Sequence, residues 1–326
     1  MRNRSWTVCA AARRPARFSD FPEPQGGQNM STQRIGIIGT GRMGTAIATR
    51  LAGQGHAVTV WNRSPDGTSK AVEAGAARAG SLADLLAASD ILISSLTDHA
   101  AIAAVLDGGD AAFSEGLDGK LWIEMSTLLP DQQRDVAARV EGAGALFLEC
   151  PVGGTVGPAL KGALLGMAGG SEAAWVRGAP VLQALCKRVE HLGPVGAGSA
   201  MKLAVNLPLA LYWAGMAEAL GLLRGSGVAA STAAEVMSDS SAGPAVLKNR
   251  LQVVKDTLDG ADQAGTFDLN GLRKDLGLAL DWAGRGGAAM PLSTAARGLY
   301  DEAIGAGLGG MDGASLTRFV LAGRSA

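Results

Sequence analysis

The stretch Arg34-Ile35-Gly36-Ile37-Ile38-Gly39-Thr40-Gly41-Arg42-Met43-Gly44, with the apolar residues that follow it, decides the fold. An apolar strand leads into three glycines at the spacing GxGxxG, and a helical pattern of apolar residues continues to Leu51. The first glycine permits a tight turn, the second lets backbone approach a pyrophosphate, and the third lets helix and strand pack closely. Residues 57–61 form a second apolar strand. The complete pattern predicts a βαβ unit that binds a dinucleotide at the start of its helix.

The end of the second strand indicates which dinucleotide binds. A site for NAD usually carries Asp or Glu about 20 residues beyond the glycines, where the carboxylate holds the ribose 2′-hydroxyl. Here the strand ends in Trp61-Asn62-Arg63-Ser64, without an acid. Arg63 can pair with a 2′-phosphate through its guanidinium fork, and Asn62 and Ser64 can donate hydrogen bonds to it. We therefore expect NADP(H) as the cofactor. The alternative is an arginine that only meets solvent.

Composition excludes several classes of protein. The 326 residues are 47% hydrophobic and 18% charged, which suits two domains with sizeable cores. A net charge of -1 gives no electrostatic reason to expect nucleic acid or an anionic membrane as partner. The three cysteines are too scattered for a disulfide framework or a CxxC metal site, and the three histidines form no ligand pair. We expect no metal, and a location in the reducing cytoplasm.

Residues 1–33 differ from the rest of the chain. They are rich in arginine, with no acid before Asp20, and then in Pro, Gly and Gln. We expect a disordered extension here. A basic leader of this kind could direct transport, but no apolar segment of the length that an export signal needs follows the arginines.

Apolar segments at 91–96, 121–125, 146–150 and 164–168 are typical of short buried strands, and helical patterns separate most of them. This alternation predicts a Rossmann-type, doubly wound, mostly parallel sheet over residues 34–194, with the cofactor across the carboxyl ends of the strands. Ser94 to Thr97 and Ser126-Thr127 lie at the ends of two of these strands, where they are placed to touch the nicotinamide half of the cofactor. Among them we expect Leu96, Thr97 and Thr127 to bind it. Ser and Thr at such positions are also common helix caps.

Residues 195–326 lack strand patterns and predict an all-helical domain for substrate binding and dimerisation. Its first long helix, roughly 199–223, is apolar enough to raise the question of a membrane span. Lys202, Asn206, Pro208 and Glu218 interrupt it, so we expect a buried helix between domains. Pro208 should kink or locally unwind the helix, because its ring removes a donor and clashes with the preceding turn.

Lys202 and Asn206 lie one helical turn apart on the same face. The pair could bracket one substrate oxygen. If Lys202 is buried, desolvation lowers its pKa toward the range useful for protonating a carbonyl oxygen. The alternative is a lysine that reaches from an apolar helix to water.

Four separated blocks resemble the β-hydroxyacid dehydrogenase family, which includes 3-hydroxyisobutyrate dehydrogenases, semialdehyde reductases and the related 6-phosphogluconate dehydrogenases. The first is the glycine loop quoted above, with Met43 before its last glycine. The others are Glu149-Cys150-Pro151-Val152-Gly153-Gly154-Thr155, Gly198 through Lys202 to Asn206, and Lys274-Asp275-Leu276. The resemblance implies that Lys202 is the general acid/base, that Asn206 binds substrate, that Lys274 reaches the cofactor, and that Asp275 lies near the substrate.

One block departs from the family pattern. The family typically reads Asp-Ala-Pro-Val-Ser-Gly-Gly, and the serine that helps to hold a substrate carboxylate is Gly153 here, followed by Gly154 and then Thr155 in place of the last glycine. Either Thr155 supplies the hydroxyl from a shifted position or the substrate lacks the usual carboxylate. The substrate therefore stays open.

The resemblance implies an NADPH-dependent oxidoreductase that transfers hydride between nicotinamide and a small aldehyde or keto acid, as a homodimer. An imine reductase is the rival enzyme class, but such enzymes usually carry Asp or Tyr where Lys202 stands. A noncatalytic NADP-binding scaffold is a third possibility. Retention of Lys202, Asn206 and Lys274 speaks against it.

Overall fold

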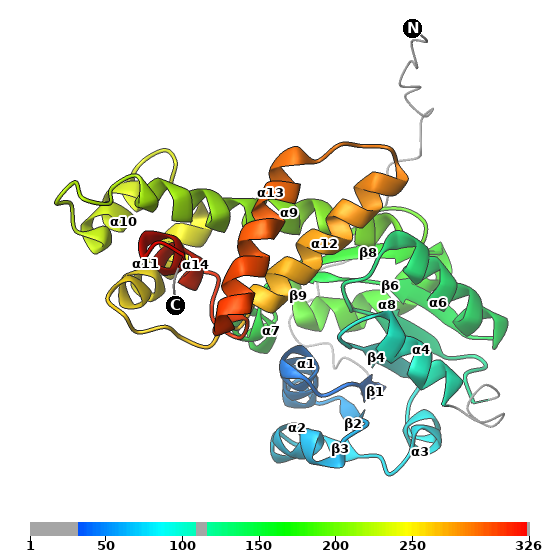
Figure 1. Cartoon of the computed structure of the whole chain (residues 1–326). Helices are drawn as coiled ribbons and strands as arrows, with labels where there is room; N and C mark the ends of the chain where they lie inside the picture. Colours follow the sequence, from blue (N-terminus) through cyan, green and yellow to red (C-terminus); the bar gives the residue numbers. More distant parts are fainter. Residues whose placement is uncertain (1–31, 109–115, 325–326) are drawn as a thin grey trace, which may run out of the picture. The chain divides into compact units, whose positions relative to one another are not determined.

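The computed structural model describes residues 32–108 and 116–324 (Figure 1). The first 31 residues, for which the sequence predicts disorder, lie outside the described residues. The described chain divides into two compact units. A sheet unit runs to Ser126 and continues from Asp131 to Ser199, and a helical unit comprises Thr127–Pro130 and all residues from Ala200 onward.

The sheet unit is built on nine strands in the order β3-β2-β1-β4-β5-β6-β8-β7, with β9 paired to β8. Pairs among β1 to β6 are parallel, β6 and β7 run antiparallel to β8, and β9 is parallel to β8. The strands are β1 Arg34–Ile38, β2 Ala57–Trp61, β3 Ala77–Arg78, β4 Ile91–Ser94, β5 Leu121–Glu124, β6 Leu146–Glu149, β7 Val152–Gly153, β8 Leu164–Gly170 and β9 Cys186–His191. The predicted doubly wound, mostly parallel sheet is confirmed, and its order reverses between β1 and β4.

Three strands escaped the sequence analysis. β3 and β7 have two residues each, which are too few to show the alternation of apolar and polar residues that is typical of a strand. β9 has the sequence Cys-Lys-Arg-Val-Glu-His, and its charged side chains hide its strand character. It pairs with β8 alone, so part of it faces solvent and can carry charge.

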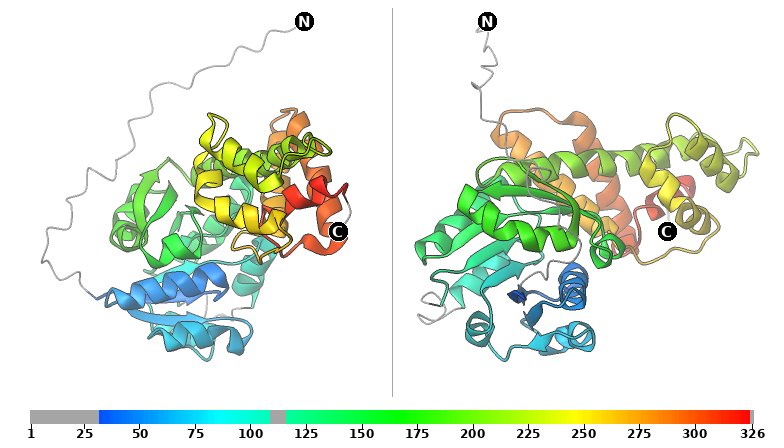
Figure 2. Two further views of the ribbon diagram at one scale, coloured as in Figure 1. Left: turned by 90° about the vertical axis from the view of Figure 1, so that its left-hand side faces the viewer. Right: turned by 180° about the vertical axis from the view of Figure 1, so that it is seen from behind.

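Helices cover both faces of the sheet (Figures 1 and 2). Alternate strand residues such as Ile37, Ile93 and Ile123 form one core with α1 and α8. On the opposite face Gly36 leaves room for Leu85 of α3, because a Cβ there would come within 3.1 Å of its Cγ. The helices of this part are α1 Arg42–Gly53, α2 Ser69–Glu73, α3 Leu82–Ala87, α4 His99–Asp107, α6 Pro130–Gly142, α7 Val156–Leu160 and α8 Glu172–Leu185.

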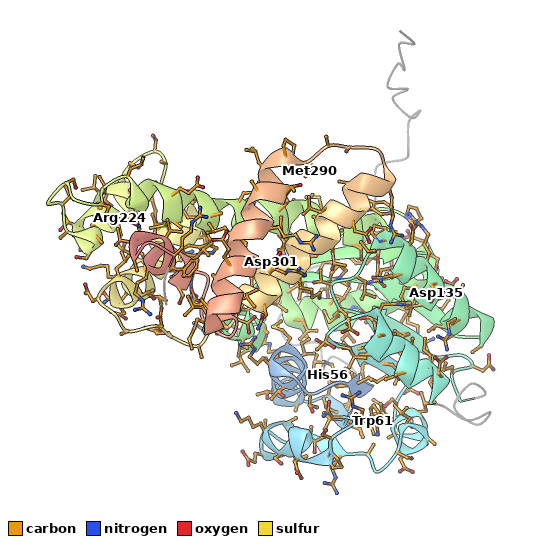
Figure 3. All side chains as sticks on the ribbon, viewed as in Figure 1. His56, Trp61, Asp135, Arg224, Met290 and Asp301 are labelled. Carbon is orange, nitrogen blue, oxygen red and sulfur yellow. The ribbon has the colours of Figure 1, made fainter. Side chains whose placement is uncertain are left out.

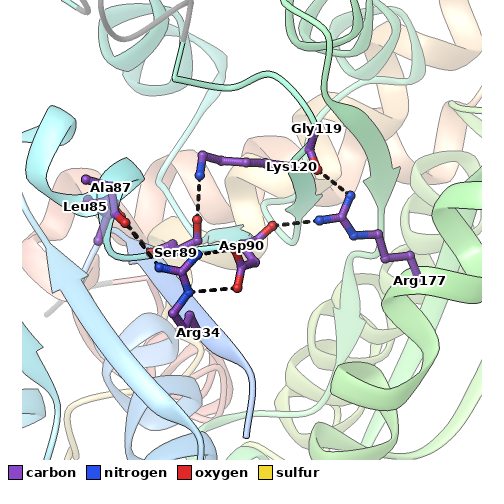
Figure 4. Close-up of polar contacts among 8 residues, drawn as sticks. All are labelled: Arg34, Leu85, Ala87, Ser89, Asp90, Gly119, Lys120 and Arg177. Carbon is purple, nitrogen blue, oxygen red and sulfur yellow. Dashed lines mark hydrogen bonds and ion pairs between the residues drawn. The ribbon is translucent and has the colours of Figure 1, made fainter. Parts of the chain in front are cut away.

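A polar cluster clamps the amino ends of three strands (Figure 4). Arg34, which begins β1, donates to both carboxylate oxygens of Asp90, at 2.9 and 2.5 Å. Lys120 donates to the Ser89 carbonyl at 2.7 Å, and Arg177 of α8 donates to the carbonyls of Gly119 and Asp90. Arg34 holds the pKa of Asp90 below its ordinary value. The cluster lies at the edge opposite the glycine loop, so we assign it to stability.

The helical unit packs around an apolar core that includes Trp213, Tyr300 and Phe319. The Tyr300 hydroxyl donates to the carbonyl of Ala210 at 2.9 Å, which satisfies its one buried polar atom. The helices are α9 Ala197–Gly221, α10 Ala230–Asp239, α11 Ala245–Leu258, α12 Leu269–Arg285, α13 Pro291–Ala303, a π-helical turn Ile304–Leu308, and α14 Ser315–Leu321. Two isolated β-bridges join the loop before α12 to the segment before α14.

Helix α9 is the one described helix that is long and apolar enough to cross a membrane, with a mean hydropathy of 1.3 over its best window. A core helix passes the same test, and α9 contributes Trp213, Met216 and Leu220 to the core. The predicted local unwinding at Pro208 is wrong, because α9 is helical throughout. Pro208 and Ala204 are both exposed, so water can satisfy the carbonyl that loses its donor.

The turn between β1 and α1 depends on two glycines. Gly39 has a φ of +93°, in the left-handed region that favours glycine. A Cβ on Gly44 would overlap the carbonyl oxygen of Gly39, so α1 can begin this close to the strand only without a side chain. Gly53, at the other end of the same helix, meets nothing within 4 Å of a Cβ placed on it.

We therefore expect Gly44→Ala to lower the free energy of unfolding by about 3 kcal/mol, since backbone must move to admit the methyl group. The matched control is Gly53→Ala, which should leave stability unchanged or raise it by up to about 1 kcal/mol. Thermal or urea unfolding of both variants measures the difference. Equal stability of the two would contradict the packing described here.

Candidate active site

The glycine loop after β1 is tied to the end of β2. The backbone N–H of Thr40 donates to Oδ1 of Asn62 at 3.3 Å, and Nδ2 of Asn62 donates to the carbonyl of Ser64 at 2.9 Å. Asn62 thus fastens the loop, a task that the sequence analysis did not assign to it. Arg42 is the first residue of α1, and Met43 packs against the sheet core.

The loop fits a dinucleotide on three observations. A Cβ on Gly41 would meet nothing within 4 Å, so open space lies where a pyrophosphate would approach the backbone. The hydroxyl of Thr40 is buried and has no hydrogen-bond partner in the described chain. Helix α1 has no acid in its first turn, so its free amides present an uncompensated positive end.

A cleft of about 470 Å³ opens beside the loop, at the ends of β2 and β3. Trp61, labelled in Figure 3, forms part of its wall, with Asn62 and Arg63 beside it. Arg78 also lines this cleft, and the sequence analysis missed it because β3 is too short to be recognised. Ser64 precedes the short helix Pro65–Thr68 and makes no cap hydrogen bond with its side chain.

Buried Glu124 organises the loops that follow β4 and β5. Its carboxylate accepts from the hydroxyl of Ser94 and, at 2.7 Å, from the N–H of Ser126. The Ser126 hydroxyl in turn accepts from the N–H of Leu96 at 2.8 Å. Burial raises the pKa of Glu124. Leu96 is therefore held through its backbone, whereas Thr97 is exposed.

Glu149, in register with Glu124 on the next strand, holds the start of α9. Its carboxylate accepts from the backbone N–H groups of Gly196, Gly198 and Ser199 at 2.6, 2.9 and 3.3 Å, and from the Ser199 hydroxyl at 2.8 Å. Burial raises the pKa of this carboxyl, and the hydrogen bonds oppose that rise. The sequence showed the acid but not its partners, which lie about 50 residues further along the chain.

The substrate block forms β7 and the turn into α7. A Cβ on Gly153 would lie 3.5 Å from Cβ of Leu165, an ordinary contact, so nothing in the sheet unit excludes a side chain there. Gly154 has a φ of +119°, and its Cβ would press on Leu164. Thr155 precedes α7 without a cap hydrogen bond from its side chain, so its hydroxyl is not committed to that helix.

The helical unit brings Lys202, Asn206 and Asp275 together. Nζ of Lys202 donates to Oδ1 of Asn206 at 3.0 Å, and Nδ2 of Asn206 donates to Oδ2 of Asp275 at 2.6 Å. Lys274 lies 3.6 Å from the other carboxylate oxygen of Asp275 and donates to the carbonyl of Thr127 at 3.2 Å. Charged groups on both sides thus fix which way the Asn206 amide points.

Lys202 does not extend to water, because only 7% of the residue is exposed. Burial lowers its pKa, the Asp275 carboxylate opposes that shift, and Lys274 adds to it. Leu129, Leu203 and Ala279 form a small apolar cluster in the same unit. An ammonium in this setting gives up its proton more readily than a surface lysine.

The predicted site residues therefore fall into two groups. Five lie together in the helical unit: Thr127, Lys202, Asn206, Lys274 and Asp275. The residues of the glycine loop, of the β2 end, and of the substrate block belong to the sheet unit, with Leu96 and Thr97. Among the described residues no group of three His, Cys, Asp or Glu could hold a metal ion. Cys150 and Cys186 are buried and free.

Comparison with known proteins identifies the chain. Residues 34–193 match the model of the NAD binding domain of 6-phosphogluconate dehydrogenase, and residues 196–320 match that of the NAD-binding domain of NADP-dependent 3-hydroxyisobutyrate dehydrogenase. A 3-hydroxyisobutyrate dehydrogenase of Pseudomonas aeruginosa is 33% identical over 82% of this chain and 90% of its own length. The chain belongs to the β-hydroxyacid dehydrogenase family. It is an NAD(P)-dependent oxidoreductase of the class that acts on CH–OH groups.

Other relatives show how broad this family is. Glyoxylate/succinic semialdehyde reductase 1 of Arabidopsis thaliana is 30% identical over 85% of this chain and 95% of its own length. Among solved structures, a 3-hydroxyisobutyrate dehydrogenase of Mycobacterium tuberculosis with L-serine has a TM-score of 0.78 at 28% identity, covering 89% of this chain and 99% of that one. A reductive aminase of Aspergillus terreus with NADPH and ethyl levulinate has a TM-score of 0.60 at 27% identity, with the same coverage.

Proposed function

We propose that this dehydrogenase is an NADPH-dependent reductase of a small aldehyde or keto acid, with Lys202 as the general acid. One observation carries the proposal: a buried lysine with a lowered pKa donates to Asn206, which is held in turn by Asp275. NADPH, when bound, supplies the hydride. Lys202 supplies the proton that the carbonyl oxygen takes up as its double bond becomes a single bond.

Each neighbour of Lys202 has a separate task in this reaction. Asn206 donates a hydrogen bond to the substrate and keeps Nζ of Lys202 directed at the reacting oxygen. Asp275 orients the amide of Asn206 and limits how far the pKa of Lys202 falls. Lys274 donates to the Thr127 carbonyl, and its proposed task, taken from the family resemblance, is to bind the cofactor. In the oxidation direction neutral Lys202 accepts the proton of the alcohol.

Two other functions compete with this one. Reductive aminases are among the structural neighbours, and an imine reductase would use the same fold. Lys202 favours carbonyl chemistry, because imine reductases usually carry Asp or Tyr at this position. A noncatalytic NADP-binding scaffold would consume no NADPH. Assays of NADPH consumption with succinic semialdehyde, glyoxylate and a cyclic imine separate the three functions.

Lys202→Ala should reduce turnover by about 10²-fold or more while leaving NADPH affinity nearly intact, since it removes a proton donor rather than a cofactor contact. In the wild type, reduction should slow as pH rises through a pKa below 10.5, because the protonated lysine is the active form. The variant should not show this fall in rate with rising pH. Lys248→Ala, an exposed lysine of α11, is the control. A variant with near-normal turnover would remove Lys202 from the mechanism.

Cofactor preference is the second test of the proposal. Arg63→Ala should lower the affinity for NADPH by about 10- to 100-fold and the affinity for NADH far less. Only NADPH carries the 2′-phosphate that a guanidinium can pair with. Fluorescence titration of both cofactors measures this. Equal losses for the two cofactors would refute the assignment of Arg63.

Gly153→Ser tests the substrate block. The added side chain has room against Leu165, so the variant should fold normally. If the glycine only weakens a carboxylate site, the serine should add a hydrogen bond worth about 1–3 kcal/mol and lower KM for small carboxylated aldehydes. We expect instead no gain with these acids and an impaired native reaction, because Thr155 and Pro158 also depart from the family pattern. A large, selective rise in kcat/KM for glyoxylate and succinic semialdehyde would show that the carboxylate site persists.

We further propose a cytoplasmic homodimer that uses a small-molecule substrate, without nucleic acid or membrane as partner. Exposed apolar side chains near the end of α9 and on α10 support an interface in the helical unit, among them Leu222 and Val236, which are 85% and 65% exposed. Wild-type protein should have the mass of a dimer in light scattering, and Leu222→Lys with Val236→Lys should shift it toward the monomer. A monomeric wild type would overturn this proposal.

A further inference from the structure

We propose that Arg78 acts with Arg63 as a second determinant of NADP(H) specificity, by binding the cofactor's 2′-phosphate. This inference rests on the proposed use of NADP(H). It adds a residue from β3 to a site that the sequence placed only after β2. Both arginines belong to the sheet unit.

The two arginines reach one cleft from neighbouring strands. β2 and β3 are parallel, with Val60 opposite Arg78, and Arg63 follows Val60 by three residues. Parallel strands end at the same edge of a sheet, so the side chains that follow them gather there. Arg63 and Arg78 both line the cleft of about 470 Å³ beside the glycine loop.

The lining of this cleft is suited to an anion. The described residues that form it include the two arginines, the hydroxyl residues Thr68 and Ser81, and no acid. A phosphate monoester carries a charge of about -1.5 to -2 near neutral pH, so one guanidinium neutralises only part of it. Two guanidiniums match it, and each can donate two parallel hydrogen bonds to phosphate oxygens.

These two arginines also differ from all others in the described chain. Each of the other arginines between residues 34 and 324 makes a hydrogen bond or an ion pair, most of them with a carboxylate or a backbone carbonyl. Arg63 and Arg78 make none with their side chains within the described residues. Two guanidiniums without partners among the described residues, in a cleft whose described lining holds no acid, indicate a ligand that carries the missing negative charge.

If Arg78 binds the adenine ring instead of the 2′-phosphate, its effect on the two cofactors differs. Its guanidinium could stack on the adenine ring, which NADH and NADPH share. Stacking would raise the affinity for both cofactors equally, whereas phosphate binding would raise the affinity for NADPH alone. Among the residues that the structure describes, the lining holds no acid, and this favours the phosphate because stacking does not require such a lining.

The test is calorimetric binding of 2′,5′-ADP and of 5′-AMP, which carry the adenosine half with and without the 2′-phosphate and need no turnover. Arg78→Ala should lower the affinity for 2′,5′-ADP about tenfold and change the affinity for 5′-AMP by no more than about twofold. Arg78→Lys should fall between, because it keeps the charge and loses the fork. Arg188→Ala, an exposed arginine of β9 paired with Glu190, is the matched control and should change neither ligand. Both arginines of the cleft are exposed, so unfolding temperatures should be unaffected.

The outcomes separate this inference from the proposed function. If Arg63→Ala weakens 2′,5′-ADP selectively and Arg78→Ala does not, NADP(H) use stands and the role of Arg78 is refuted. Equal weakening of both ligands by Arg78→Ala assigns the residue to adenine and also refutes it. If wild-type protein binds 5′-AMP as tightly as 2′,5′-ADP, the proposed preference for NADPH itself fails.

Discussion

The buried carboxylate of Glu149 is the constraint on which the first turn of helix α9 depends. A carboxylate withdrawn from water is stable only when hydrogen bonds replace its hydration, and four donors from residues 196–199 do so here. The same bonds satisfy backbone amides that the first turn of a helix leaves without partners, and the negative charge lies at the favourable end of the helix dipole. The end of β6 is thereby fixed to residues 196–199 within the sheet unit.

A second buried charge, that of Lys202, explains the polar cluster of the helical unit. An ammonium inside an apolar helix is costly, and its cost appears as a lowered pKa. The amide of Asn206 and the carboxylate of Asp275 compensate part of that cost without neutralising the lysine by direct contact. A lysine paired directly with a carboxylate would hold its proton more firmly.

The glycine loop depends on the absence of side chains. Gly44 lets α1 start against the turn, and Gly41 leaves open the space that a pyrophosphate would fill. Asn62 joins this loop to the β2 end and also lines the cleft of Arg63 and Arg78. The loop after β1 and the ends of β2 and β3 thus belong to a single unit.

The sequence by itself determined the parallel sheet, the glycine turn, the helical second part and the family, because each rests on local spacing that a chain displays along its length. It also placed Lys202 and Asn206 on one helical face, since a separation of four residues fixes that geometry. Only the tertiary structure decided what lies across from these residues. Asp275 meets Asn206 from 69 positions away, Glu149 meets Ser199 from 50, and Arg78 joins Arg63 through a strand of two residues. The spacing of residues along the chain reveals neither burial nor contacts between distant segments. The lowered pKa of Lys202 and the position of Arg78 beside Arg63 could therefore be recognised only in the folded structure.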